Sequence, residues 1–484
     1  MSSNDIIKIG LDFGTHQTKI CIQKTPDEGH GEPSYEFFSF EDLEGGKSYF
    51  LPSIVQINQD DTLSYGFVDR SKEKNAEVPP KLDLLEIPSI DINQEAELLF
   101  EKYASSQQDE NDIVAIEQML RLKSDLERQR IEHENEIRHS NFDEAVKKYR
   151  ASRNIFRYFK QATFSTREWD AKIDSQRLCI WYLAYVIFLL EERYGALFSI
   201  HMGIPTDDNS FENKRKLAIS TLASAYNLVE NVFENDFNAF LKTHVDELLV
   251  KTKIVPFSNE VKEEYAINVF PEAYSGLLSL TSRGKLTLGM SLTVDIGGGT
   301  TDISFFTIDD RKPCIYKYWS IPVGLNYLAE ESGFDYFEHE LKQDFKDSVV
   351  DAYNAEKTKV VRKLISILYS KLSKTAISKN RLTTALKDRI LVYMGGGSTY
   401  NNVTIEHQPF TDVHRIDKSI WKEEQVRDKS EVEKLCTLLS VSFGLVSAKD
   451  DDEVELYSME SIFGEVPLKS DITIGNRYVD KDMV

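Results

Sequence analysis

The sequence has little cysteine: four residues, Cys21, Cys179, Cys314 and Cys436, which form no CxxC pair and no group with histidine. A disulfide framework and a zinc site are therefore not expected, and a reducing compartment fits this composition best. Two familiar phosphate-binding loops are also missing, because no GxxxxGK[ST] segment occurs and no GxGxxG joins a strand to a helix. This absence excludes the P-loop NTPases and the Rossmann dinucleotide-binding proteins.

Long hydrophobic runs and clustered basic residues are equally scarce. The longest apolar run, LCIWYLAYVIFLL over 178–190, is too short to cross a bilayer and indicates a buried helix. The opening MSSNDIIKIG has an acidic residue and no apolar run of signal-peptide length. The 80 acidic residues outnumber the 58 basic ones, which argues against nucleic acid and anionic membranes as partners. We therefore expect a cytoplasmic protein that binds neither.

The order of segments predicts an α/β protein with two or three folded units. A hairpin is predicted over 5–23, because two apolar runs flank a glycine-containing turn. Strands and helices then alternate along the chain, as in α/β layers. The predicted strands are 50–58, 197–205, a pair within 292–308, and 389–394, and the predicted helical segments are 176–194, 210–227, 325–380 and 430–447.

Two segments stand apart by their charge. Residues 75–152 begin with a proline-containing linker and carry apolar residues at roughly helical spacing among dense charges. We expect one or two long, exposed helices there, forming an insertion over 75–154 that is either a surface elaboration or an arm for a partner. Residues 449–484 open with KDDDEVE and are expected to form a short acidic tail.

Chemistry is concentrated in two similar turns, DFGTHQTK at 12–19 and DIGGGTTD at 295–302. Each lies between two apolar strands, so glycine and threonine occupy the turn of a hairpin. Glycine lets successive backbone N–H groups approach phosphate oxygens, and threonine hydroxyls add hydrogen bonds. The opening Asp12 or Asp295 can hold the water ligands of Mg²⁺. Either turn alone also fits a hairpin turn without a ligand.

A third glycine cluster, MGGGST at 394–399, follows the apolar run RILVY. A strand that ends at bare glycine backbone offers a flat surface against which a nucleoside could lie closely. A tight strand-to-helix turn without a ligand explains the same residues equally well.

These three motifs, in this order, resemble those of the superfamily of actin, sugar kinases and heat-shock chaperone ATPases. Two more segments are similar to its connecting helices, VFPEAYSGLLSL at 269–280 and LLSVSFGLVSA at 438–448, and HMGIPTDDNSFENKRKL at 201–217 resembles a chaperone segment. The resemblance covers most of 5–72 and 155–448. It is strongest to the ATPase domain of the seventy-kilodalton heat-shock chaperones, without their substrate-binding domain.

The resemblance implies a two-lobed actin-like ATPase fold, in which duplicated ribonuclease H-like α/β domains carry a helical insertion. The first lobe would comprise 1–74 and 155–275, the insertion 75–154, the second lobe 276–448 and the acidic tail 449–484. The ligands implied are ATP or ADP with Mg²⁺.

By resemblance, the motif positions supply a nearly complete site for phosphoryl transfer. Asp12 and Asp295 would hold hydrated Mg²⁺, Thr300 would take part in catalysis, and Glu272 would orient the attacking water. As the residue after Pro271, Glu272 also fits a carboxylate that complements a helix dipole. The residues expected to bind the nucleotide are Gly14, Thr15 and His16 in the first turn, Gly297, Gly298, Gly299 and Thr300 in the second, and Gly395, Gly396, Gly397 and Ser398 beside the adenosine.

Two lysines compete for the catalytic phosphate contact. Lys160 lies in IFRYFKQATF (155–164), which resembles the chaperone segment that supplies such a lysine, whereas Lys19 lies inside the first turn as in actin-like members. We favour Lys19, because its motif match is tighter. His16 departs from the chaperones, which usually carry a small hydroxyl residue there. A neutral imidazole can still donate to a phosphate, and a solvent-facing turn residue is the alternative.

We expect slow, Mg²⁺-dependent ATP hydrolysis and favour a chaperone-like nucleotide switch. In such a switch the nucleotide closes two lobes, and a protein partner reports the closure. The residues after Ala448 are too few for a peptide-binding domain, so a client would bind the 75–154 insertion or a separate chain.

Two other hypotheses stay open. An actin-like filament-forming ATPase is favoured by Lys19 and by the PEA at 271–273. A small-molecule kinase would need a general base, for which Asp207 or Asp208 is available, although two acids after Pro205 also fit a helix cap.

Overall fold

The computed structural model describes residues 5–26, 31–74, 154–165, 167–169, 171–205, 211–281, 290–309, 312–332, 345–372, 389–410, 412–415, 435–450 and 454, with scattered positions between 121 and 144. The chain forms two compact units. One comprises Met1–Lys74, Ile155–Trp169 and Ile173–Val484, and the other Asn75–Asn154 and Asp170–Lys172. In the second unit, the described residues between 121 and 144 are helical and mostly exposed, and Arg128 lies 3.3 Å from Asp125 one turn away.

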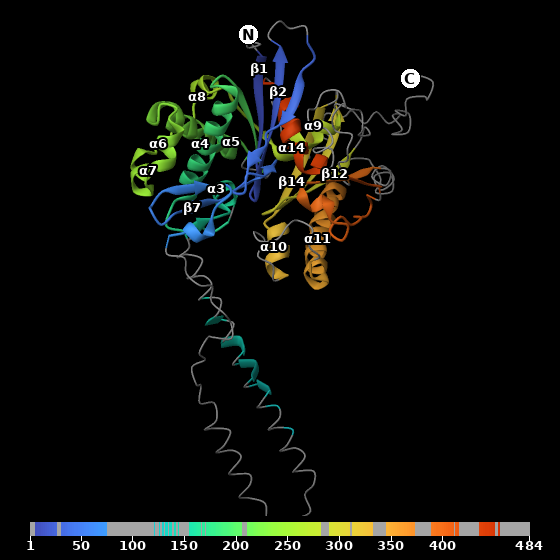
Figure 1. Ribbon diagram of the computed structural model, residues 1–484. Helices are drawn as coiled ribbons and strands as arrows, with labels where there is room; N and C mark the ends of the chain where they lie inside the picture. Colours follow the sequence, from blue (N-terminus) through green and yellow to red (C-terminus); the bar gives the residue numbers. More distant parts are fainter. Residues whose placement is uncertain are drawn as a thin grey trace, which may run out of the picture. The chain divides into compact units, whose positions relative to one another are not determined.

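A six-stranded sheet organises the beginning of the first unit (Figure 1). Its strand order is β11 (Ile267–Pro271), β10 (Ser199–Ile204), β1 (Asp5–Phe13), β2 (Gln17–Pro26) and β3 (Ser34–Phe37), with β6 (Leu51–Pro52) also paired to β2. β1 pairs antiparallel with β2, which confirms the hairpin predicted over 5–23, and parallel with β10.

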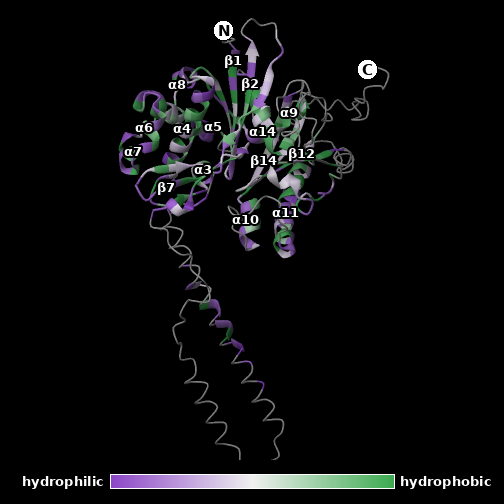
Figure 2. Ribbon diagram, in the orientation of Figure 1, coloured by the Kyte–Doolittle hydropathy of each residue, from purple (hydrophilic) through white to green (hydrophobic). Residues whose placement is uncertain are grey.

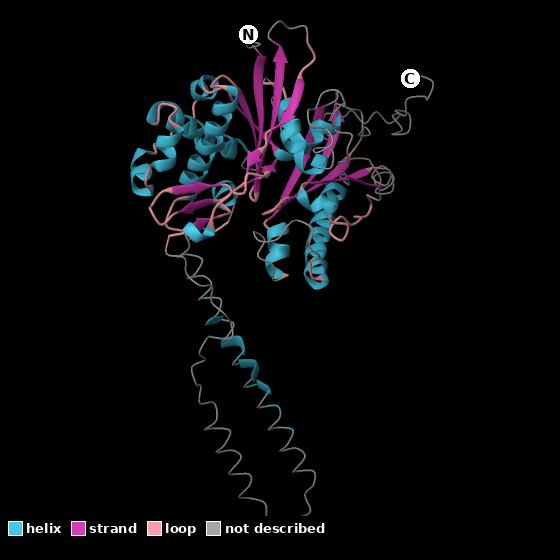
Figure 3. Ribbon diagram, in the orientation of Figure 1, coloured by secondary structure: helices cyan, strands magenta, loops and turns pink. Residues whose placement is uncertain are grey.

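A five-stranded sheet organises the later part of this unit (Figure 3). Its order is β14 (Lys312–Ile321), β13 (Thr301–Asp309), β12 (Ser291–Ile296), β15 (Ile390–Met394) and β16 (Asp412–Arg415). β12 pairs antiparallel with β13 and parallel with β15, as β1 does with β2 and β10. The protein is therefore a mixed α/β structure with several sheets, and its two larger sheets share one order of pairing.

Two smaller sheets complete the described strands: β4 (Phe40–Glu41) with β5 (Lys47–Ser48), and β8 (Leu63–Tyr65), β7 (Val55–Ile57) and β9 (Ile155–Phe156). The strand predicted over 50–58 is wrong as a single strand, because it is divided between β6 and β7. Pro52 has no N–H to continue the ladder, and Ser53 N instead donates to His16 O at 2.9 Å. The division ties this segment to the first turn.

The described α-helices are α3 (Phe159–Phe164), α4 (Ser175–Tyr194), α5 (Phe211–Asn227), α6 (Phe237–Lys242), α7 (Val245–Lys251), α8 (Asn259–Glu264), α9 (Glu272–Thr281), α10 (Leu325–Glu331), α11 (Asp347–Leu372) and α14 (Cys436–Ser447). Single helical turns lie at Arg70–Lys72, Leu228–Val232 and Gly396–Thr399. α4 shows why the local sequence forms a helix: Asp174 Oδ1 accepts from Arg177 N at its start, and Gly195, at φ +79°, ends it. The helices predicted over 176–194 and 210–227 are confirmed.

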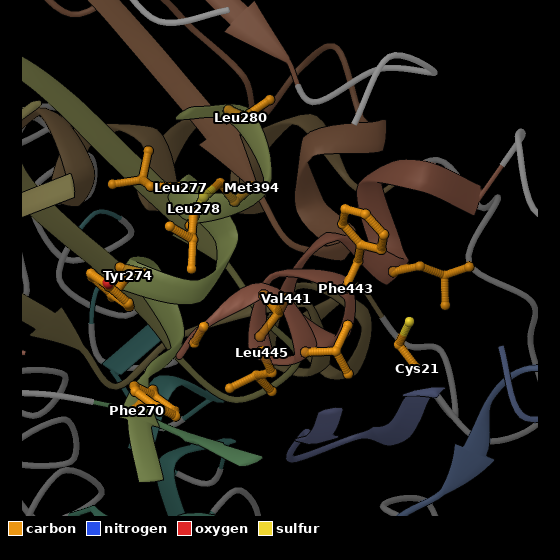
Figure 4. Close-up of a cluster of buried hydrophobic side chains, with 14 of the residues drawn as sticks. Cys21, Phe270, Tyr274, Leu277, Leu278, Leu280, Met394, Val441, Phe443 and Leu445 are labelled. Atoms are coloured by element: carbon orange, nitrogen blue, oxygen red, sulfur yellow. The ribbon is translucent and has the colours of Figure 1, made fainter. Parts of the chain in front are cut away.

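Helices α9 and α14 lie side by side, and α14 also packs on β1, β2 and β10 (Figure 1). Two glycines allow this close packing. A Cβ on Gly444 of α14 would lie 1.7 Å from Ser275 O of α9, and one on Gly10 of β1 would lie 2.2 Å from Ser442 O of α14. Around this crossing, buried side chains such as Leu277, Met394 and Leu445 form one apolar cluster (Figure 4).

The hydrophobic residues follow the sheets and the helices packed against them (Figure 2). A second apolar cluster, which includes Val294, Leu325, Leu364 and Val403, joins the five-stranded sheet to α10 and α11. No helix among the residues that the structure describes is long and apolar enough to cross a membrane.

Candidate functional site

The first of the two sequence-predicted turns closes the hairpin between β1 and β2. Asp12 lies opposite Lys19 in the ladder, and Lys19 Nζ is 2.8 Å from Asp12 Oδ2. Gly14 N donates to Asp12 O at 3.1 Å, and Ser53 Oγ donates to Gly14 O at 2.7 Å. Asp12 is buried, so its charge is stabilised by this ion pair.

The second turn closes the hairpin between β12 and β13, where Asp295 lies opposite Asp302. Gly297 N donates to Thr300 O at 2.9 Å across the turn. The beginning of α10 packs directly against it, because Leu325 N donates to Gly297 O at 3.0 Å. Each turn is therefore held by hydrogen bonds from another segment.

Both turns line a single cavity, together with residues from α3, α9 and the end of β15. The predicted site residues that line it are Asp12, Gly14, Thr15, His16, Lys19, Lys160, Glu272, Asp295, Gly297, Gly298, Gly299, Thr300, Gly395 and Gly396. Segments that are far apart in the sequence are thus brought together by the two sheets. The roles assigned to these residues remain predictions.

The two turns approach each other closely at glycine positions. A Cβ on Gly298 would lie 2.7 Å from His16 Cβ, and one on Gly299 would lie 2.9 Å from Thr15 Cγ2. Gln161 of α3 adds a direct bond, because its Nε2 donates to Gly299 O at 3.1 Å. Side chains at these two glycines would push the turns apart.

Lys160 and Glu272 form the second ion pair of the cavity. Lys160 Nζ donates to Glu272 Oε1 at 2.5 Å, and the lysine is 3% exposed. Glu272 follows Pro271 as the first residue of α9, so it starts a helix and lines the cavity as well. Because Lys19 and Lys160 both line the cavity, their geometry does not separate the two lysine hypotheses.

Carboxylates crowd around Asp295. Burial raises the pKa of Asp295 well above its usual value, and the charges of Glu272, Asp302 and Asp12 raise it further, whereas Lys19 lowers it. Burial likewise raises the pKa of Asp302 to about 7. Three carboxyl groups, those of Asp12, Glu272 and Asp295, thus line the cavity beside two lysines, and a bound cation would favour the ionised form of Asp295.

His16 lies half-buried between the turns. Burial lowers its pKa to about 3, with further lowering by the positive charges of Lys19 and Arg157. At neutral pH the imidazole is therefore uncharged and has one donor and one acceptor nitrogen. Such a ring can donate one hydrogen bond to an anion without adding charge.

The carboxylates of the cavity suit a hydrated Mg²⁺ ion rather than one enclosed by protein ligands. Among the residues that the structure describes, no group of three or more His, Cys, Asp or Glu side chains could hold a metal ion by itself. Asp12 and Asp295 nevertheless face the same cavity. Mg²⁺ usually takes one or two carboxylates and keeps several waters. The residues therefore fit a hydrated Mg²⁺ whose other ligands would include phosphate oxygens.

The third glycine cluster divides into two pairs. Gly395, at φ +74°, and Gly396 line the cavity, and a Cβ on Gly395 would lie 2.4 Å from Asp295 Oδ1. Gly397 packs on Ile296, where a Cβ would lie 2.2 Å from Ile296 Cγ2. Ser398 is buried and donates to Gly395 O at 2.7 Å. Neither Gly397 nor Ser398 belongs to the cavity lining: Ser398 bonds the backbone of the first pair, and Gly397 packs on Ile296.

Sequence reasoning missed part of the lining. The unassigned lining residues are Gln17, Gln161, Ser165, Pro205, Leu325, Thr437, Leu438 and Val441. Gln161 follows Lys160 in a segment that resembles a chaperone segment. Thr437, Leu438 and Val441 adjoin or belong to the motif at 438–448. The sequence therefore indicated these segments but not the individual side chains that line the cavity. Asp207 and Asp208 lie outside the described residues.

No family model matches the chain, and no curated protein matches its sequence. A solved structure to which the chain is similar is the crystal structure of MreB 5 of Spiroplasma citri bound to AMPPNP. The sequence identity is 11%, the TM-score is 0.37, and the alignment covers 91% of this chain and 94% of that one. At this score, the similarity carries no argument about the function of the chain.

Proposed function

We propose that the chain binds ATP with Mg²⁺ in the cavity between its two larger sheets and hydrolyses the γ-phosphate slowly. One observation carries the proposal: two Asp–Gly hairpin turns, one from each sheet, line the same cavity. Their glycines can present backbone N–H groups to phosphate oxygens from both sides. Two aspartates, Asp12 and Asp295, open these turns.

The shared strand order of the two sheets supports a two-lobed actin-like ATPase fold with duplicated ribonuclease H-like domains. In this proposal, 1–74 with 155–275 forms the first lobe, 276–448 the second, 75–154 the helical insertion and 449–484 the tail. The paired helices α9 and α14 connect the lobes, since both contact each other and α14 packs on β1.

The proposed chemistry uses the charges already paired in the cavity. Mg²⁺, when bound, would be held by Asp12 and Asp295 and would neutralise part of the phosphate charge. Lys19 and Lys160 supply positive charge, and Glu272 is suited to orient a water, because Lys160 holds its carboxylate at 2.5 Å. Apolar Leu325, Leu438 and Val441 provide contact area for a base beside the bare backbone of the glycine pair that ends β15.

We propose that the protein uses ATP hydrolysis as a chaperone-like switch. Its protein partner would bind the 75–154 insertion or a separate chain that acts with it. Two contacts between the segment 158–161 and the part of the chain with the second sheet support it: Gln161 Nε2 donates to Gly299 O, and Tyr158 Oη donates to Glu330 Oε1 of α10 at 2.6 Å. A phosphate group between the turns would alter these contacts and so the spacing of the sheets. An actin-like filament is the alternative, and light scattering that rises with ATP and protein concentration would identify it.

Calorimetry with ATP and ADP, each with and without Mg²⁺, tests the site directly. Wild-type protein is expected to bind ATP more tightly with Mg²⁺ and to release phosphate slowly. Asp12→Asn should lower hydrolysis about a hundredfold or more and stay folded, since a preorganised charge at the reacting phosphate is lost. Asp236→Asn is the matched control, because Asp236 caps α6 and lies outside this cavity. Wild-type hydrolysis by Asp12→Asn would exclude the proposed Mg²⁺ role.

A further inference from the structure

Gln161 of α3 is a buried side chain that lines the cavity beside Lys160. It is 4% exposed, and its Nε2 donates to Gly299 O in the second turn at 3.1 Å. Its Oε1 accepts from Arg167 Nη1 at 3.3 Å. Because a guanidinium can only donate and a backbone carbonyl can only accept, these two partners fix which end of the carboxamide is oxygen and which is nitrogen. The donor group of Gln161 therefore faces the second turn.

Arg167 holds this orientation from outside the cavity lining. Its guanidinium lies 3.9 Å from the centroid of the Tyr158 ring, and Tyr158 Oη donates to Glu330 Oε1 of α10 at 2.6 Å. The ring face attracts the guanidinium through a cation–π interaction. The oxygen of Gln161 is therefore anchored by a residue that is itself held in place.

The bond to Gly299 O fixes the peptide group that joins Gly299 to Thr300. That group is planar, so holding its carbonyl also holds the Thr300 nitrogen. The approach is close, since a Cβ on Gly299 would lie 2.9 Å from Gln161 Oε1. Thr300 lines the cavity and is expected to take part in catalysis. The orientation of the second turn at Thr300 therefore depends on Gln161.

The preceding residue of α3 holds another group that the reaction would use. Lys160 Nζ donates to Glu272 Oε1 at 2.5 Å, and Glu272 is the carboxylate proposed to orient the attacking water. Consecutive residues of one short helix thus bind this carboxylate and the second turn. Helix α3 therefore links two groups whose alignment decides the rate of an in-line attack on phosphate.

We propose that Gln161 is a positioning residue for ATP hydrolysis, which fixes the Gly299–Thr300 peptide relative to Glu272. This inference rests on the proposed function. Displacement of a reacting group by about 1 Å can lower a rate on the order of a hundredfold. Binding of ATP draws on backbone groups of both turns and is less sensitive to such a shift. Loss of the Gln161 donor should therefore lower kcat and leave the affinity for ATP nearly unchanged.

Gln161→Met and Gln161→Glu test this role through steady-state hydrolysis and calorimetry with ATP in Mg²⁺. Gln161→Met keeps the length of the side chain and removes the donor, so kcat should fall about tenfold or more while the Kd for ATP changes less than about twofold. Gln161→Glu can still accept from Arg167, but an ionised carboxylate cannot donate to Gly299 O. A protonated carboxyl group can, so the ratio of the kcat of Gln161→Glu to that of wild type should rise as pH falls from 8 to 5.

Gln176→Met is the matched control, because Gln176 Nε2 donates to Thr221 Oγ1 at 3.2 Å and lies outside the cavity lining. It should lower the melting temperature, as Gln161→Met does, and leave kcat unchanged. Wild-type kcat in Gln161→Met, or a loss of ATP affinity as large as its loss of kcat, would overturn the positioning role and leave the proposed function intact. If Gln161→Met does not fold, a kcat ratio for Gln161→Glu that is independent of pH overturns the role instead. Failure of wild-type protein to bind or hydrolyse ATP would refute the proposed function and this inference with it.

Discussion

Asp302 is expected to cost the nucleotide-free protein stability at neutral and alkaline pH. It lies on β13 opposite Asp295, it is 7% exposed, and Ser320 Oγ donates to its Oδ1 at 2.5 Å. Burial raises its pKa from 3.8 to about 7, the Ser320 hydrogen bond opposes this rise, and the charge of Glu272 adds to it. Asp302→Asn keeps the shape and cannot ionise.

The sign follows from proton binding. The pKa of Asp302 is higher in the folded than in the unfolded protein. The folded protein therefore has its full stability with respect to this group below pH 3.8, where Asp302 is protonated in both states. That stability is lost as pH rises from 3.8 to about 7. An interval of roughly three pH units, at about 1.4 kcal/mol per unit, gives on the order of 4 kcal/mol of lost stability at pH 8. Asp302→Asn should therefore unfold at higher urea than wild type at pH 8.

Urea unfolding of nucleotide-free protein at pH 5 and pH 8 measures this effect. The stability advantage of Asp302→Asn should grow by about 2.6 kcal/mol between the two values, because most of the wild-type loss falls in that interval. Ser320→Ala is the control, since it removes the hydrogen bond that lowers the pKa of Asp302 and should extend the loss to higher pH. An equal difference between Asp302→Asn and wild type at both pH values would refute the reasoning.

Two further predictions concern the lysines. Lys160→Ala should lower turnover more than ATP affinity, because Glu272 loses its partner. Lys19→Ala should mainly lower ATP affinity. Unchanged kinetics and calorimetry in both variants would show that neither lysine acts on phosphate. Burial lowers the pKa of Lys357 to about 7, so the folded protein loses stability as pH falls from 10.5 through 7. Lys357→Met should remove this loss. Equal urea midpoints for Lys357→Met and wild type at about pH 6 would contradict this prediction.

The sequence was sufficient where a feature depends on residues close along the chain. Both hairpins could be predicted, because apolar runs flank Gly14 in one segment and Gly297–Gly299 in the other. The helix over 176–194 has its own start and stop residues, Asp174 and Gly195, so it was also predictable. The residues of the two turns line the cavity for the same reason, since each hairpin exposes its turn at one end of a sheet.

Features that depend on distant segments could not be predicted. The division of the 50–58 strand follows from Pro52 at a sheet position, where the pairing partner is unknown from sequence. Gly397 looked equivalent to Gly395, yet Ile296 of another strand covers the place of its side chain. No motif indicated that α10 docks on the second turn, where Asn326 N donates to Gly298 O.

The second turn and the helix α10 packed against it carry several groups that are costly in the nucleotide-free protein. Asp295 is half-buried among other carboxylates, the pKa of Asp302 is raised to about 7, and the Asn326 carboxamide has no partner within the described residues. A cation bound beside Asp295 would offset the first cost. Because a ligand that binds only the folded state adds stability in proportion to the logarithm of its concentration over Kd, Mg²⁺ and ATP together should stabilise the protein more than the sum of each alone. Strictly additive shifts in melting temperature would mean that Mg²⁺ and ATP bind independently of each other.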